Sequence, residues 1–279
     1  MVFKKVESLN ELKSICQKPN YREVGNWYAR RVIRDAALPI TRLLLYTGIT
    51  AHQVTTISLI VALIGIAFLA LPSAFIFFLG TLLLQLWYLL DHVDGQIARY
   101  RKTSCLTGRF FDFITHHMTH GLIFFSLGYY GFELSGIPLI VVWGFLTSIF
   151  TMLFNLLSDT KYKTFFEALS GGKSFEIVPS SHEPLSSLST PLIQRALKKI
   201  YSFCHKLVEI HVLMNILTVS ALLNLLPWFP MDLRVALLLF YGTVIPLLTL
   251  SKIVYWISSG SIDQEFNQTF REAKAVTPK

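Results

Sequence analysis

Long apolar runs constrain this chain more than any other feature. Of its 279 residues, 53% are hydrophobic and 15% are charged, and its mean hydropathy is +0.52. A soluble domain usually carries about 25% charged residues. A soluble fold would also have to hide several apolar runs of about 20 residues, which is the length that crosses a bilayer. The sequence therefore predicts an all-α, polytopic membrane protein.

We expect six transmembrane helices and an N-terminal amphipathic surface helix. The chain then divides into a cytosolic N-terminal segment 1–51, a six-span domain 52–257 and a cytosolic tail 258–279. The first 40 residues contain no apolar signal region, so we expect no cleaved leader. The six expected spans are 52–71, 74–98, 110–132, 137–158, 207–228 and 233–257.

Basic residues alternate between the connections and predict the orientation. Segment 1–51 carries nine Lys or Arg, whereas the first, third and fifth connections together contain only Arg234. Because cytosolic loops carry the excess of Lys and Arg, both termini and the even-numbered connections are expected in the cytosol. The net charge of +8 then reflects topology and attraction to anionic lipid, and we expect no nucleic-acid partner.

The three cysteines fall on the predicted cytosolic side, where thiols stay reduced. We therefore expect free thiols and no disulfide framework at Cys16, Cys105 and Cys204.

The segment 21–51 is typical of a helix that lies on the membrane surface, with Arg side chains at the headgroups. Pro39 is expected to end or kink its first part. The alternative is a basic flank that only sets topology. The apolar positions with helical spacing are Val32, Ile33, Ala36, Ala37 and Ile40.

Residues 87–121 place three Asp and four His between two of the most apolar segments. In the second span, Asp91, Asp94, Gly95 and Ala98 recur at helical spacing and share one face. In the third span, Gly108, Asp112, His116 and His120 stand four apart and also share a face. A short basic turn would bring these two faces together, and the small residues leave room for a ligand.

Carboxylates in a span need a partner, because each costs roughly 2.5–3.5 kcal/mol to insert. A divalent cation would offset this cost and the mutual repulsion of the three Asp. Oxygen ligands of this kind suit Mg²⁺ or Mn²⁺, whose remaining positions are often filled by water and substrate phosphates. The alternative is a structural set of ion pairs between Asp and Arg99, Arg101 or Arg109.

The spacing from Asp91 to His116 resembles the signature of the CDP-alcohol phosphotransferases, also called CDP-alcohol phosphatidyltransferases. Seven of the eight fixed positions match with every gap kept, and the eighth carries His116 where the family has Asp. The six expected spans and the lead-in "NWYARR…PITRLLLYTGITAHQVTTIS" give weaker, family-like support over most of the chain.

The resemblance implies an integral membrane transferase, often homodimeric, with Mg²⁺ or Mn²⁺ as cofactor. It would move a phospho-alcohol group from CDP-diacylglycerol or a CDP-polyol to a hydroxyl acceptor and release CMP, in phospholipid or related biosynthesis. A polyol phosphate is one candidate acceptor, and the basic residues near the motif could bind its phosphate or could only set topology. By resemblance, CDP would be held by Asp91, Asp94, Gly95, Ala98, Arg99 and Gly108, and the metal by Asp91, Asp94, Asp112 and His116.

His116, the implied catalytic base, is the one departure from the signature. A neutral imidazole can accept a proton and can bind a metal, but the exchange removes one negative charge and one oxygen ligand. The alternative function is therefore a catalytically silent CDP-lipid binder or scaffold. His120 either assists His116 or, as we expect, hydrogen-bonds to a neighbouring helix. Glu209 and His211 stand two apart, so we expect them to face different sides of the fifth span.

A transporter is a third class of function. It would favour broken helices and internal repeats, and this sequence shows no internal repeat.

Overall fold

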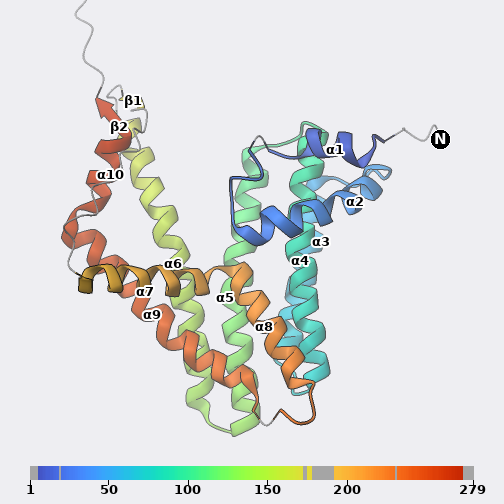
Figure 1. The fold of residues 1–279 in the computed structure, drawn as a ribbon, viewed down its shortest axis with the longest axis vertical. Helices are drawn as coiled ribbons and strands as arrows, with labels where there is room; N and C mark the ends of the chain where they lie inside the picture. The colour runs from blue at the N-terminus through green and yellow to red at the C-terminus, as the bar shows by residue number, and fades with distance from the viewer. Residues whose placement is uncertain (1–5, 19, 172–174, 178–191, 230, 273–279) are drawn as a thin grey trace, which may run out of the picture.

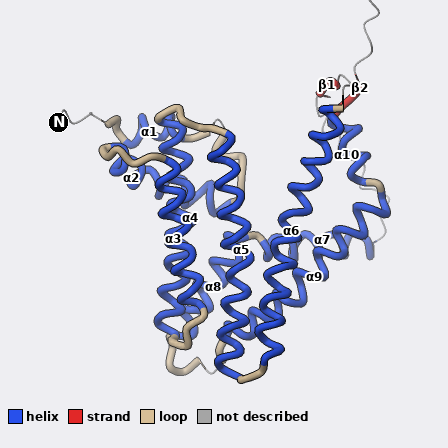
Figure 2. Tube along the Cα trace, turned by 180° about the vertical axis from the view of Figure 1, so that it is seen from behind, coloured by secondary structure: helices blue, strands red, loops and turns tan. Residues whose placement is uncertain are grey.

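The computed structural model describes residues 6–18, 20–171, 175–177, 192–229 and 231–272 (Figure 1). The first five residues of the predicted N-terminal segment, the loop residues 178–191 and the tail residues 273–279 lie outside the described residues. The fold is a bundle of long helices joined by short connections, as the apolar runs predict (Figure 2).

The two ends of the bundle differ. The α4–α5 connection lies at the same end as α1 and α10, whereas the α3–α4, α5–α6 and α8–α9 connections lie at the opposite end (Figure 1). A short strand β1 (Phe175–Ile177) pairs antiparallel with β2 (Phe270–Glu272). The helices are α1 (Leu9–Cys16), α2 (Arg34–Leu45), α3 (Ala51–Leu69), α4 (Ala74–Tyr100), α5 (Leu106–Ser135), α6 (Pro138–Ser170), α7 (Leu192–Val208), α8 (Ile210–Asn224), α9 (Leu233–Ser259) and α10 (Ser261–Thr269).

Four described helices, α3, α4, α6 and α9, are long and apolar enough to cross a membrane. A fifth span is formed only if residues 199–208 of α7 and the whole of α8, which are bent by 71°, cross together. The helix α5 has 30 residues but does not meet the same apolar standard, because it carries the polar face around Asp112 and His116. The chain is a multi-pass membrane protein, and the number six stays a prediction.

The predicted fifth span, 207–228, is not one straight helix. The chain breaks at Glu209, whose backbone is extended, and α8 then runs for 15 residues. At 1.5 Å per residue this is about 22 Å, which is shorter than the roughly 30 Å hydrocarbon core. The break carries no Gly or Pro, the two residues that usually announce one in a sequence.

Within the segment predicted to form the surface helix, the structure has a π-turn, Ala29–Ile33, followed by α2. The helix α2 continues through Pro39, so Pro39 does not end it, and a kink at this residue stays a prediction. Ala37, Leu38 and Leu45 are buried in a cluster with Val93 and Ile97 of α4. These contacts fix α2 beside the motif helix, while its position on the membrane surface stays a prediction.

Pairs of glycines set the closest helix contacts. A Cβ on Gly80 of α4 would lie 2.8 Å from the carbonyl oxygen of Gly65 in α3. A Cβ on Gly144 of α6 would lie 2.6 Å from the Cα of Gly128 in α5. The backbones of α3 and α4, and of α5 and α6, therefore touch at these positions, as small residues in membrane helices allow.

The opposite end of the bundle is held by Arg234, which is only 2% exposed. Its Nη2 donates to Asp232 at 2.8 Å and to the hydroxyl of Tyr130 at 2.6 Å. Its Nη1 and Nη2 also donate to the carbonyls of Leu71 and Pro72 in the α3–α4 connection. One guanidinium thus ties three segments together without an unpaired buried charge.

Candidate active site

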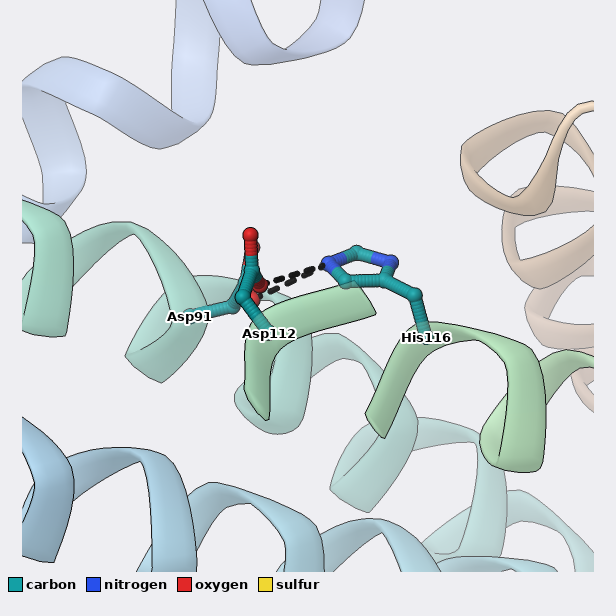
Figure 3. Close-up of side chains that lie close together, drawn as sticks. All are labelled: Asp91, Asp112 and His116. Carbon is teal, nitrogen blue, oxygen red and sulfur yellow. Dashed lines mark hydrogen bonds and ion pairs between the residues drawn. The ribbon is translucent and has the colours of Figure 1, made fainter. Parts of the chain in front are cut away.

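The antiparallel helices α4 and α5 bring the two polar faces together, as the spacing predicts. His116 Nε2 lies 3.0 Å from Asp91 Oδ1 and 3.4 Å from Asp112 Oδ1 (Figure 3). The Asp91 side chain is 12% exposed, whereas that of Asp112 is 43% exposed. The indole of Trp87 packs 5.1 Å from the imidazole of His116 and closes one side of the cluster.

This cluster fits a divalent cation. One ligand atom from each of Asp91, Asp112 and His116 lies within 4.8 Å of the others. Two carboxylates and an imidazole suit Mn²⁺ well and Mg²⁺ acceptably. Asp94 lies outside the cluster, and its Oδ2 accepts a 2.5 Å hydrogen bond from Thr55 of α3. Metal binding by Asp94 stays a prediction.

The alternative of Asp–Arg ion pairs is wrong for the described residues. The guanidinium of Arg99 donates through Nε to the carbonyl of Cys16 in α1. That of Arg101 donates to the carbonyls of Thr47 and Ile49 before α3. No arginine within the described ranges forms an ion pair with Asp91, Asp94 or Asp112.

A first cavity of about 180 Å³ opens on the carboxylate side of the cluster. Gly95 faces it, and a Cβ there would meet only the Arg99 guanidinium, at 3.2 Å. Ala98 and Gly108, the other small residues of the motif, do not line it. The cavity is lined by two groups of residues. Those of the motif are Asp91, His92, Asp94, Gly95, Gln96, Arg99 and Asp112, and those of the N-terminal segment are Gln17, Lys18, Tyr21 and Arg34.

The N-terminal wall of this cavity was not foreseen from the sequence. The carbonyl of Arg34 accepts hydrogen bonds from Gln96 at 2.9 Å and from Gln17 at 3.2 Å. Gln96 also accepts from Thr41 at 2.6 Å. The polar Gln96 inside an apolar helix was the available signal, because a buried amide needs partners. Burial beneath this wall raises the pKa of the Cys16 thiol to about 11.

A second, larger cavity of about 400 Å³ lies on the other side of His116. His120 Nδ1 lies 3.0 Å from the amide nitrogen of Asn155, which confirms the expected bond between His120 and a neighbouring helix. His117 lies 3.1 Å from Asp159. The cavity is lined by His116, His117 and His120 of α5, by Phe154, Asn155, Ser158 and Asp159 of α6, and by His205, Val208, Glu209, Ile210 and His211 around the α7–α8 break.

Two features of this second cavity were not predicted from the sequence. Glu209 and His211 lie 3.4 Å apart, so the expectation that they face different sides is wrong, because the helix breaks between α7 and α8. Asn155, Ser158 and Asp159 recur at helical spacing near the end of the fourth predicted span. That spacing was the signal that could have placed them on one face.

The comparison with protein families agrees with this geometry. Residues 48–178 match the family described as CDP-alcohol phosphatidyltransferase. The chain is similar to this family over these residues, which include the whole motif from Asp91 to His116. A search of curated proteins found no match. That family consists of transferases of substituted phosphate groups that use divalent metals. The match covers α3 to α6, so the N-terminal wall of the first cavity and the α7–α8 wall of the second lie outside it.

Proposed function

We propose that the protein transfers a phospho-alcohol group from CDP-diacylglycerol or a CDP-polyol to a hydroxyl acceptor and releases CMP, in phospholipid or related biosynthesis. The observation that carries the proposal is the cluster of Asp91, Asp112 and His116, which lies between two cavities. A transfer between two substrates needs one site for each and a reactive centre between them.

The first cavity has the chemistry for the CDP donor. Three positively charged side chains line it, those of Lys18, Arg34 and Arg99. Such side chains form strong, charge-assisted hydrogen bonds with phosphates. The proposed CDP-binding residues remain Asp91, Asp94, Gly95, Ala98, Arg99 and Gly108. Lys18 and Arg34 extend this set into the N-terminal segment.

The proposed metal ligands are Asp91, Asp94, Asp112 and His116. When bound, Mg²⁺ or Mn²⁺ would neutralise the pyrophosphate and stabilise CMP as the leaving group. The carboxylates would hold the cation, and Asp91 keeps His116 in place through their 3.0 Å contact.

His116 can serve as the base through its other nitrogen. A carboxylate only accepts hydrogen bonds, so Nε2 carries the proton that it shares with Asp91 and Nδ1 is then free to accept one. This second nitrogen points away from both carboxylates (Figure 3). The acceptor oxygen attacks the β-phosphorus, the hydroxyl proton passes to His116, and the bond between that phosphorus and the CMP oxygen breaks. Ligation of a metal by Nε2 would leave the proton on Nδ1, so the two roles compete.

The test is metal-dependent release of CMP from CDP-diacylglycerol and from CDP-glycerol, with an extract of the native host as the source of acceptor alcohols, measured by mass spectrometry. Asp91→Asn, Asp94→Asn and Asp112→Asn should each abolish it. The exposed Asp263→Asn is the matched control and should keep full activity. Full activity in all three motif variants would show that the assignment is wrong.

His116 motivates a second candidate, a catalytically silent binder of CDP-lipids. It predicts binding of CDP-diacylglycerol without CMP release under either metal. His116→Asp, which completes the family signature, would then restore turnover. A gain of activity in this variant together with an inactive parent would favour the binder.

We also propose that both termini and the site face the cytosol. The position of α1 and α10 at the end of the bundle that holds the α4–α5 connection supports this (Figure 1). Cys105 is exposed in that connection. A membrane-impermeant maleimide should label it in inside-out vesicles and not in right-side-out vesicles. A homodimer is proposed from the family alone, and crosslinking in membranes tests it.

A further inference from the structure

We propose that the second cavity is the acceptor subsite, and that it takes an alcohol that carries no phosphate of its own. This inference rests on the proposed function and names its second substrate. The two cavities share the catalytic cluster but differ in charge, and this difference carries the argument.

The position of the second cavity suits the attacking hydroxyl. The first cavity touches the cluster through Asp91 and Asp112, whereas the second touches it through His116. In phosphoryl transfer the attacking and leaving oxygens lie roughly in line on opposite sides of phosphorus. With CMP leaving into the first cavity, the acceptor must approach from the second.

The charge of the second cavity disfavours a phosphate monoester. Its described lining contains no Lys or Arg. It contains five histidines and two carboxylates, Asp159 and Glu209, which lie 3.1 Å from His117 and 3.4 Å from His211. Proteins recognise phosphate chiefly through Arg and Lys, as the first cavity does with Arg34 and Arg99. A dianionic phosphate placed beside two carboxylates would be repelled, and such mismatches discriminate against the wrong ligand.

Lys252 is a described cation close to this wall, and its ammonium is already engaged. Nζ donates to the hydroxyl of Ser158 at 3.0 Å. It also lies 4.6 Å from the ring of Phe154 and 4.7 Å from that of Trp256. Lys252 is buried behind Ser158 and is not part of the lining.

His120 supplies a hydroxyl-binding group. Because the Asn155 amide donates to Nδ1, the proton of the neutral ring sits on Nε2. That atom is buried and makes no hydrogen bond of ordinary geometry with the described residues. The main chain of Val208 also interacts with the His120 imidazole. A hydroxyl can accept from the ring N–H and donate to a main-chain carbonyl, so one alcohol group satisfies both.

The decisive experiment runs the reaction backwards without assuming the acceptor. The full chain is incubated with ¹⁵N-labelled CMP, Mn²⁺ and a lipid extract of the organism that encodes it. A labelled CDP-alcohol shows the proposed transfer, and the alcohol released with it is identified by mass. We expect that alcohol to lack phosphate, whether it is water-soluble or lipid. Release of a phosphorylated alcohol overturns this inference, whereas the absence of any labelled CDP-species contradicts the proposed function instead.

Variants then place the alcohol in the cavity. Asn155→Leu keeps the size of the side chain and removes the amide that orients His120. We expect at least a tenfold rise in KM for the identified alcohol, with the Kd of CMP unchanged. His120→Phe should act in the same way. Thr164→Val, at an exposed position of α6, is the control and should leave both constants unchanged. An unchanged KM in both cavity variants overturns the assignment of the cavity.

Lys252→Met separates the two acceptor classes. For an alcohol without phosphate we expect its KM to stay within about threefold, because Lys252 lies behind the wall. A hundredfold rise in that KM in this variant, with the Kd of CMP unchanged, would show that an acceptor phosphate reaches Lys252. This result would overturn the inference.

Discussion

Replacing His116 by Asp should make the folded protein depend on a divalent cation. The change puts a third carboxylate where the imidazole now contacts Asp91 at 3.0 Å and Asp112 at 3.4 Å. Two like charges about 4 Å apart repel by about 4 kcal/mol at an effective dielectric constant of about 20. Because the Asp112 side chain is 43% exposed, solvent weakens the repulsion between this carboxylate and the new one. We therefore expect His116→Asp to lose about 2–4 kcal/mol of unfolding free energy without metal.

A bound cation should restore most of this loss. A ligand at 100 times its Kd adds about 2.7 kcal/mol to the folded state, and an all-carboxylate site binds Mg²⁺ or Mn²⁺ more strongly than one with an imidazole. The assay is thermal unfolding in detergent, with chelator and with each metal. Gln268→Asp, at an exposed position of α10, is the control and should respond to metal as the parent does. An equal metal-induced shift in parent and His116→Asp would refute the reasoning.

Three further predictions concern packing, thiol reactivity and the donor cavity. Gly144→Ala should cost about 1–3 kcal/mol of stability in chemical unfolding, because its Cβ meets the Gly128 backbone at 2.6 Å; an unchanged midpoint would contradict the contact. N-ethylmaleimide at neutral pH should modify exposed Cys105 and spare buried Cys16. The pKa of the Cys16 thiol is about 11, so this thiol stays protonated until strongly alkaline pH. Mass spectrometry of the folded protein reports both sites. Arg34→Gln should weaken CMP binding about tenfold, the scale of one charged hydrogen bond, and an unaltered Kd would remove Arg34 from the nucleotide site.

Local spacing was enough to predict the centre of the site. The i, i+3 and i+4 positions of one helix share a face whatever surrounds it, so Asp91 could be paired with Asp112 and His116 from the sequence alone. The opposition of the two helices also followed, because a short connection forces them to run antiparallel. The distances in the cluster confirm this part of the prediction.

The walls of the two cavities could not be predicted in the same way. The main-chain carbonyl of Arg34 accepts a hydrogen bond from the side-chain amide of Gln96, which lies 62 residues further along the sequence. Such pairings depend on tertiary packing, which no local pattern encodes. The break at Glu209 was missed because an ordinary helix-forming sequence is bent there by its surroundings. As a result of this break, the imidazole of His211 lies 3.4 Å from the carboxylate of Glu209.

The buried guanidinium of Arg234 makes one end of the bundle depend on a single side chain. It fastens the α3–α4 connection, α5 and the start of α9 at the end opposite the catalytic cluster. Loss of this guanidinium would leave the carbonyls of Leu71 and Pro72 without their hydrogen-bond donor and would remove a partner from Asp232 and Tyr130. One substitution far from the reacting groups would thus weaken the contacts among three segments at once.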